Sequence, residues 1–404
     1  MVMVKAFRAL RPSASLVREV ASPPYDVINT REARALAASK PASFLHVSRP
    51  EIDLPEGVDE HDPAVYLRAV SNLRGMINAG ALVRDAEAHL YLYAQTMGAH
   101  RQVGVVGCVS VDEYDCDVIR KHEKTRADKE DDRTLHVHAL AAHDEPVFLA
   151  YRAEAAIDGL VARVTAEAPT WDFVTDDGVG HTFWVLSRSD SERLEGLFAG
   201  VETLYVADGH HRSAAASRVH ALRAGEGGEH DRFLAVVFPD DQLQILPYHR
   251  LVRDTRGRSP EALLAALGAV LDLEPVADAQ PTAARSVGLF VGGRWYRGRF
   301  HAATRNDDDP VARLDASWVQ DHLLAGLFGI DDPRRDKNVD FVGGIRGTAA
   351  LEARVRDEGW SLAIAMYPTS MAELLAVSDA GRLMPPKSTW FEPKLRSGLF
   401  VHTL

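Results

Sequence analysis

The feature that most constrains the fold is the intermingling of strand-like and helix-like segments along the chain. Short apolar runs typical of strands alternate with amphipathic stretches typical of helices from one end to the other. This order excludes an all-helical and an all-β architecture. We therefore predict an α/β (α+β) protein, and 404 residues are enough for two or three domains.

Several segments carry specific expectations. Residues 88–97 and 101–114 are predicted to be neighbouring strands of a hairpin or meander, and 170–187 to be two strands around a turn. Residues 43–51 are interpreted as a strand that leads into a loop. Residues 231–252 are interpreted as a two-strand hairpin. All five segments combine apolar residues of high strand propensity with nearby turn residues.

Changes of pattern along the chain indicate three parts. The segment 1–90 is expected to be an α/β segment that packs on a central core at 91–255. After about Asp254 the pattern of helices and hairpins restarts, so we expect a C-terminal α/β domain at 256–404. The tail of that domain is irregular and rich in proline, and we expect it to close the functional site.

Charge and cysteine usage limit the partners and the compartment. The net charge is −12, whereas general binding to nucleic acid needs many Lys and Arg on one face, so no nucleic-acid partner is expected. The N-terminal stretch MVMVKAFRAL lacks the pattern of a signal peptide, and no apolar run is long enough to span a bilayer. Cys108 and Cys116 form no CxxC pair. We expect a cytoplasmic protein with no membrane partner.

The stretch VADGHHRSAAA contains the most informative turn, Asp208–Arg212, which we call the DGHHR turn. A buried strand is predicted to end at Ala207 and a helix to begin near Ser213. Backbone N–H groups at a helix start carry partial positive charge, and a glycine allows a ligand to approach the backbone. The guanidinium of Arg212 matches phosphate oxygens, and Asp208 could hold magnesium or orient a histidine. The pattern therefore predicts a phosphate cradle.

Two other interpretations of the DGHHR turn remain open. It could be a solvated helix cap with Asp208 near the N-cap position. It could also be a metal site at His210, His211 and Asp208, although zinc needs a third or fourth ligand and a hard cation needs more carboxylates. A Walker loop is excluded, because no GxxxxGK[ST] pattern is present here.

Ionisable residues also gather in the stretch RKHEKT. Lys121, His122 and Glu123 are adjacent, and a carboxylate among basic groups can act as a general base toward a substrate hydroxyl. The alternative is a charged, solvated loop or helix start. In LPYHRLV, His249 and Arg250 interrupt an apolar strand, where an arginine either extends its charge to solvent or meets an anion.

The tail MPPKSTWFEPKLRSG places polar side chains in a segment made rigid by prolines. Lys387 and Ser388 are the candidates here for substrate binding. The alternative is a tail that only fastens the C-terminus to the core.

Five stretches together resemble a known family. SPPYDVI, RKHEKT, ADGHHR, LPYHRLV and MPPKSTWFEPKLRSG occur between Pro23 and Gly398 in the order seen in the prokaryotic family catalogued as domain of unknown function 1015. The DGHHR turn also resembles the phosphate-binding turn of the ParB/sulfiredoxin superfamily, and most of all that of its free-serine kinases. This resemblance implies a ParB/sulfiredoxin-like core with N-terminal and C-terminal additions and with an insertion at about 134–203.

The resemblance to the free-serine kinases also implies roles for individual residues. In those kinases a His-Glu pair upstream of the turn supplies the base, which corresponds here to His122 and Glu123. Gly209, His210, His211 and Arg212 would hold the donor phosphates, and Asp208 would bind Mg²⁺ or assist the base. Independently of this resemblance, the sequence stretches themselves lead us to expect Lys121, His249 and Arg250 to complete the anion pocket, with Lys387 and Ser388 at the substrate.

The expected activity is that of a small-molecule kinase. The donor would be ATP, ADP or pyrophosphate, and the acceptor a hydroxyl, with free L-serine as the best candidate. One alternative is a non-catalytic, nucleotide-binding regulatory protein that uses the same cradle for a CTP-like ligand. Another is a metal-dependent phosphatase or nuclease. A homodimer is left open.

Overall fold

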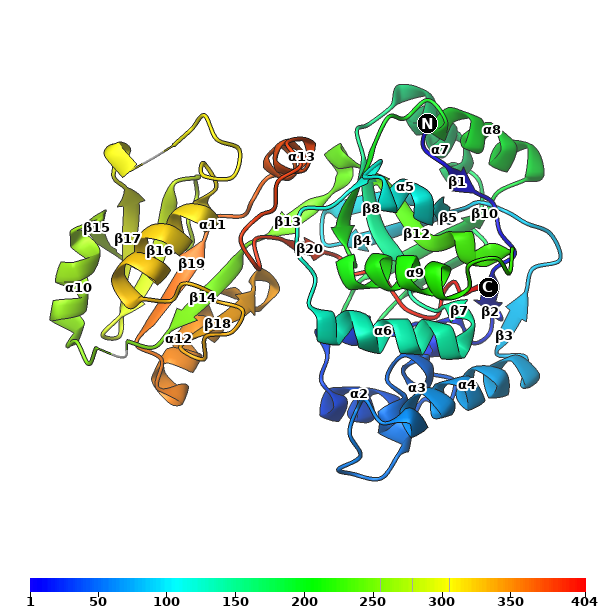
Figure 1. The fold of residues 1–404 in the computed structure, drawn as a ribbon, viewed down its shortest axis with the longest axis horizontal. Coiled ribbons are helices and arrows are strands. Elements are labelled where there is room, and N and C mark those ends of the chain that lie inside the picture. Colours follow the sequence, from blue (N-terminus) through cyan, green and yellow to red (C-terminus); the bar gives the residue numbers. More distant parts are fainter. Residues whose placement is uncertain (255, 278, 305) are drawn as a thin grey trace. The chain divides into compact units, whose positions relative to one another are not determined.

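The structure is a computed structural model in which the chain forms two compact units (Figure 1). It describes residues 1–254, 256–277, 279–304 and 306–404. The first unit comprises 1–121, 125–243 and 393–404, and the second comprises 122–124 and 244–392. Strands and helices intermingle in both units, which confirms the predicted α/β class.

The first unit is built on a mixed sheet. The strands of this sheet are β1 (Val4–Lys5), β4 (Tyr91–Met97), β5 (His100–Ser110), β6 (Ile119–Arg120), β8 (Val147–Tyr151), β9 (Trp171–Val174), β10 (Gly180–Val185), β11 (Leu204–Asp208) and β12 (Arg232–Pro239). Their order is β6-β11-β8-β12-β5-β4-β10-β9, with β1 beside β5. The predicted strand pairs at 88–114 and 170–187 are confirmed, because β4 pairs with β5 and β9 with β10, both antiparallel.

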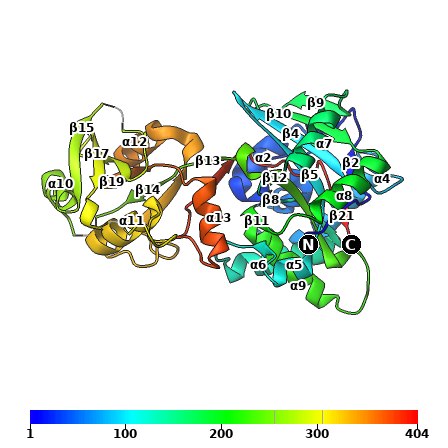
Figure 2. The same ribbon diagram turned by 90° about the horizontal axis from the view of Figure 1, so that it is seen from above.

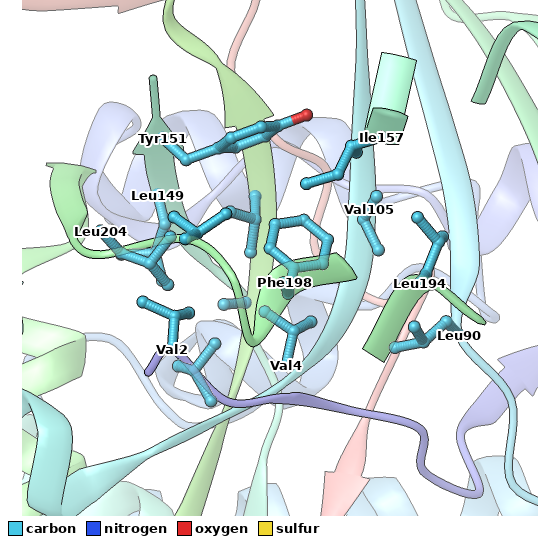
Figure 3. Close-up of a cluster of buried hydrophobic side chains, with 14 of the residues drawn as sticks. Val2, Val4, Leu90, Val105, Leu149, Tyr151, Ile157, Leu194, Phe198 and Leu204 are labelled. Carbon is cyan, nitrogen blue, oxygen red and sulfur yellow. The ribbon is translucent and has the colours of Figure 1, made fainter. Parts of the chain in front are cut away.

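Two groups of helices accompany this sheet. One group is α5 (Val111–Asp115), α6 (Ala127–Leu140) and α9 (His210–Leu222), in which α9 contacts both of the others (Figure 2). The other is α7 (Ala155–Thr165) and α8 (Arg188–Phe198). Side chains from α7 and α8, such as Ile157, Leu194 and Phe198, meet Val105 and Leu149 of the sheet in a buried apolar cluster (Figure 3). Burial of this apolar surface stabilises the unit.

The remaining elements of the first unit come from the N-terminal segment and from short pairs of strands. They include β2 (Leu10–Pro12), α1 (Val17–Val20), the 3₁₀ turn η1 (Tyr25–Val27), α2 (Thr30–Ala37), α3 (Leu45–Ser48), α4 (Pro63–Asn78), β3 (Leu82–Arg84), β7 (Ala142–His143) and β21 (His402–Thr403). The last strand, β21, pairs with β7, so the C-terminus is part of the first unit.

The second unit contains a sheet of order β15-β17-β16-β19-β14-β18 and a separate pair, β13 and β20. Its strands are β13 (Gln244–Leu246), β14 (Tyr248–Val252), β15 (Leu271–Val276), β16 (Ser286–Val291), β17 (Arg294–Phe300), β18 (Val339–Gly343), β19 (Leu362–Met366) and β20 (Trp390–Glu392). Its helices are α10 (Pro260–Gly268), α11 (Asp315–Trp318), the π-helical η6 (Val319–Phe328), α12 (Gly347–Glu358) and α13 (Met371–Asp379).

Successive residues of β19 show how this second sheet is covered. Leu362 and Ile364 belong to the buried apolar cluster that contains side chains of α10. Ala363 belongs to a second cluster, which contains Leu351 of α12. This alternation is the period of two that a strand requires. Both faces of the second sheet therefore carry apolar clusters.

The prediction of a strand at 43–51 was wrong, because the structure places α3 there. Phe44 and Val47 are buried with residues of α4, and Leu45 is buried in a neighbouring cluster. A short apolar run fits the helical and the strand period about equally well, and packing against α4 selects the helix.

The prediction of a hairpin at 231–252 was also wrong. β12 pairs with β5 and β8 in the first unit, whereas β14 pairs with β18 and β19 in the second. The sequence shows two strands close together, but strand pairing depends on partners that lie far away along the chain. Among the described residues, no helix combines the length and the apolar character needed to cross a bilayer.

Candidate functional site

The DGHHR turn joins β11 directly to α9. The strand ends at Asp208 and the helix begins at His210, three residues before the predicted start at Ser213. Gly209 lies between them with φ of +95°, in the left-handed region that glycine adopts without strain. Ser213 lies inside the helix, where its hydroxyl donates to the Gly209 carbonyl oxygen at 3.2 Å. The glycine, and not the serine, marks the helix start.

A β-bulge lies immediately before this turn. Val206 is opposite Leu149 and Asp208 is opposite Phe148, so Ala207 is the extra residue on β11. A bulge bends a strand and changes the direction in which the next side chain points. It therefore helps to orient Asp208 at the end of the strand.

Arg212 is folded inward over the turn. Its side chain is only 9% exposed, and Nη1 donates to the Pro146 carbonyl oxygen at 2.5 Å. Nη2 lies 3.6 Å from Asp26 Oδ2 and 4.0 Å from Asp208 Oδ2. Burial lowers the pKa of Arg212, but the nearby carboxylates outweigh it and the pKa is raised. Within the described part of the chain, Nε has no hydrogen-bond partner.

Asp208 is engaged on both of its oxygens. Oδ1 accepts from the Gly209 N–H at 2.9 Å, and Oδ2 accepts from Lys394 Nζ at 2.9 Å. Burial raises the pKa of Asp208, but Lys394 and Arg212 outweigh it and hold the pKa well below its usual range. A carboxylate already held in this way does not form a magnesium site by itself. Mg²⁺ would have to arrive with the phosphates of a nucleotide, as it commonly does in phosphoryl-transfer sites.

The two histidines of the turn lie in the first turn of α9. His210 is buried, and burial lowers its pKa to about 4. His211 Nε2 accepts from the Arg126 N–H at 3.1 Å, so that nitrogen carries no proton. Arg212 and Lys394 both bring positive charge beside Asp208 at this turn.

Sequence reasoning missed two carboxylates near Arg212. Asp26 belongs to the SPPYDVI stretch, in which the sequence predicts no site residue. Glu145 precedes β8, and its Oε1 accepts from the Tyr25 N–H at 3.1 Å and from Ser397 Oγ at 2.6 Å. Burial raises the pKa of Glu145 to about 7. A single acid before a strand is typical of a solvated turn, so no local signal could have found it.

The RKHEKT residues are divided between the two units. Lys121 belongs to the first unit, where Nζ pairs with Asp117 at 2.9 Å. His122 and Glu123 belong to the second unit, in which the His122 carbonyl oxygen accepts from the Met384 N–H at 2.8 Å. Their assembly with the DGHHR turn stays a prediction.

His249 and Arg250 project from opposite faces of the second sheet, because they are consecutive residues of β14. His249 Nδ1 accepts from the Met366 N–H at 3.1 Å, and burial lowers its pKa to about 4. Arg250 lies over the Phe341 ring at 5.5 Å, and burial lowers its pKa to about 10. Their place in an anion pocket stays a prediction.

Lys387 and Ser388 also belong to the second unit. Lys387 Nζ lies 5.5 Å from the centre of the Tyr248 ring, and Ser388 Oγ donates to the Pro385 carbonyl oxygen at 2.6 Å. These contacts suit a rigid tail. A role of either residue in substrate binding stays a prediction.

Comparison with known proteins supplies a family and several similar structures. The model of the family described as protein of unknown function (DUF1015) matches residues 4–317. No curated protein matches the chain. Similar solved structures include a conserved hypothetical protein from Pyrococcus furiosus, with 14% identity, TM-score 0.38, and coverage of 74% of this chain and 95% of that one.

Two further structures are similar at the same level. A free serine kinase in complex with AMP has 13% identity and TM-score 0.37, with coverage of 71% of this chain and 86% of that one. SbnI with a C-terminal truncation, from Staphylococcus aureus, has 12% identity and TM-score 0.38, with coverage of 74% and 87%.

Proposed function

The chain belongs to the DUF1015 family, and from that premise we propose that it is a small-molecule kinase whose DGHHR turn binds the phosphates of the donor. The observation that carries the proposal is the geometry of the turn. A left-handed glycine opens the 13-residue helix α9, and two cations, Arg212 and Lys394, lie beside it. The first N–H groups of a helix have no partner within the helix, and together with the helix dipole they favour an anion.

The proposed reaction transfers one phosphoryl group to a hydroxyl. The hydroxyl oxygen of L-serine attacks the terminal phosphorus of the donor, and the bond from that phosphorus to its bridging oxygen breaks. The leaving group is ADP from ATP, AMP from ADP, or phosphate from pyrophosphate. The hydroxyl proton passes to a base. We propose Glu123 as this base, with His122 beside it, because the His-Glu pair precedes the DGHHR turn in the same order as the motifs of the free-serine kinases. Such transfers depend mostly on positioning and on neutralisation of charge.

The other assignments remain part of this proposal. Lys121, His249 and Arg250 are proposed to extend the anion pocket, and Lys387 and Ser388 to contact the acceptor. Mg²⁺ is proposed to enter with the donor. We also propose that residues 134–203 are an insertion in a ParB/sulfiredoxin-like core at 91–255, flanked by 1–90 and 256–404.

The purified full chain tests the proposal directly. It is incubated with L-serine and with ATP, ADP or pyrophosphate, each with and without Mg²⁺, and O-phosphoserine is measured by phosphorus NMR and mass spectrometry. We expect O-phosphoserine with one of the three donors. Tight nucleotide binding without any phosphorylated acceptor would replace the kinase by a regulatory protein. Metal-dependent release of phosphate without serine would indicate a hydrolase.

A further inference from the structure

The C-terminal tail contributes one cation to the DGHHR turn. Residues 393–404 belong to the first unit, and Lys394 Nζ lies 2.9 Å from Asp208 Oδ2. The Lys394 side chain is 14% exposed. The pair joins positions 186 residues apart, so only the folded tail brings this charge to the turn.

Two buried glutamines hold the backbone of Lys394 in place. Gln95 on β4 and Gln102 on β5 are directly opposite each other and fully buried. Gln102 Nε2 donates to Gln95 Oε1 at 3.0 Å, and Gln95 Nε2 donates to the Lys394 carbonyl oxygen at 2.8 Å. Burying two amides costs free energy that hydrogen bonds must offset. We call these two hydrogen bonds, from Gln102 to Gln95 and from Gln95 to Lys394, the glutamine relay. The relay fixes the backbone position of Lys394, whereas the backbone of a lysine in a flexible surface segment is not held in this way.

The other cation at the turn, Arg212, is more deeply buried than Lys394. Nη1 of Arg212 is committed to the Pro146 carbonyl oxygen, and its guanidinium is almost completely buried. Lys394 has three N–H donors on a flexible stem, and one of its partners is the carboxylate of Asp208. An ammonium held against one anion can exchange it for another of higher charge when that anion enters the same place.

We propose that Lys394 is a phosphate-binding residue of this site, with Gln95 and Gln102 as its positioning residues. The inference rests on the proposed function and adds a specific residue to it. Lys394 releases Asp208 Oδ2 when the donor arrives and donates to a phosphate oxygen. The competing role is purely structural, in which the ion pair only fastens the tail to the first unit.

Two variants separate these roles without leaving a buried carboxylate unpaired. Asp208→Asn removes the partner charge and keeps Lys394, and the double variant Asp208→Asn/Lys394→Met removes both. Affinity for pyrophosphate and for ADP is measured by isothermal titration without Mg²⁺. We expect Asp208→Asn to bind pyrophosphate at least as tightly as the parent. The double variant should bind it about tenfold or more weakly than Asp208→Asn, which is typical of one hydrogen bond to a charged group.

The matched control is Lys5→Met. Lys5 pairs with Glu195 of α8 at 2.7 Å, so the substitution removes a lysine–carboxylate pair of the same unit elsewhere. Its affinity for pyrophosphate should equal that of the parent. In the parent protein, pyrophosphate should also protect Lys394, and not Lys5, from acetylation followed by mass spectrometry, a readout that needs no variant to fold.

The outcomes distinguish this inference from the function on which it rests. If the parent binds pyrophosphate or ADP, but the double variant matches Asp208→Asn and Lys394 is not protected, Lys394 has only a structural role and the donor site remains. If the parent binds neither probe with or without Mg²⁺, both the donor site and the role of Lys394 are overturned.

Discussion

At the scale of single residues, Gly209 is the position where the DGHHR turn tolerates least change. Its φ of +95° is costly for any other residue, and a Cβ there would lie 3.0 Å from Arg212 Nε. Arg212 cannot easily move away, because it is buried and bound to the Pro146 carbonyl oxygen. The backbone of the turn and the guanidinium thus depend on the absence of a side chain at this glycine.

We therefore predict that Gly209→Ala lowers the free energy of unfolding by ~2 kcal/mol or more, from the left-handed backbone and the contact with Arg212 together. It should also weaken binding of the phosphate donor. Urea unfolding and isothermal titration with ADP measure the two effects.

Gly225→Ala is the matched control for the backbone cost. Gly225 has φ of +91°, and nothing lies within 4 Å of the position that its Cβ would take. The substitution should cost only about 1–2 kcal/mol and leave donor affinity unchanged. Equal effects of the two substitutions would show that the contact between Gly209 and Arg212 is unimportant.

Substitution of the proposed base, Glu123, should affect the rate of turnover but not the affinity for the donor. Glu123→Gln should leave donor affinity nearly unchanged and lower the single-turnover rate with L-serine by about 10²- to 10⁴-fold, the usual contribution of a positioned base. Glutamine keeps the size of the side chain but cannot accept the proton. By contrast, Arg212→Ala should weaken donor binding as well as turnover. A Glu123→Gln variant with the parent rate would place the base elsewhere.

At the scale of elements, the glutamine relay links the hairpin of β4 and β5 to the tail. The relay supplies hydrogen-bond partners for two fully buried amide side chains in this pair of strands. Loss of either amide leaves a buried polar group without its partner. The position of the tail at the DGHHR turn therefore depends on strands that are distant in sequence.

We predict that Gln95→Leu destabilises the protein by about 1–3 kcal/mol, because the Lys394 carbonyl oxygen and the Gln102 amide both lose a partner. Donor affinity should fall with it, since Lys394 loses its anchor. Gln242→Leu is the control, because Gln242 Oε1 accepts from the Val103 N–H and, within the described part of the chain, no hydrogen bond joins Gln242 to the tail. That variant should lose stability but keep its affinity for pyrophosphate. Unchanged affinity in Gln95→Leu would contradict the positioning role.

At the scale of the whole molecule, Glu145 connects three distant segments. The Glu145 carboxylate accepts hydrogen bonds from the Tyr25 N–H near the N-terminus and from the Ser397 hydroxyl in the tail. It also lies close enough to Arg212 of α9 to raise the pKa of that guanidinium. Burial raises the pKa of Glu145 to about 7 from its usual 4.5. The folded protein therefore retains this proton over a pH range in which the unfolded chain has lost it.

This difference makes the stability of the first unit depend on pH. The contribution of protonated Glu145 is fully present below pH 4.5 and is lost as the pH rises through about 7. Glu145→Gln stays neutral at every pH, so it should gain stability relative to the parent between pH 5 and pH 8, by up to ~3 kcal/mol at 1.4 kcal/mol per pKa unit. Urea unfolding across this range measures the gain. A constant difference between the two proteins would rule out ionisation of Glu145.

The sequence alone determined the features that depend on neighbouring residues. The mixed α/β class followed from the alternation of strand-like and helix-like patterns of apolar residues along the chain. The strand pairs β4–β5 and β9–β10 followed from apolar runs separated by short turns. The junction of a strand and a helix at the DGHHR turn was found for the same reason, with an error of three residues in the helix start. The order of five local motifs was enough to identify the family.

Which distant residues meet depends on the tertiary structure. The strands of 231–252 separate into two sheets, and Asp26, Glu145 and Lys394 come from three far-apart segments to surround Arg212 and Asp208. No local pattern marks such residues, because each one alone is typical of a solvated turn or tail. Their charges acquire a role only when burial removes water and places opposite charges within a few ångströms of one another.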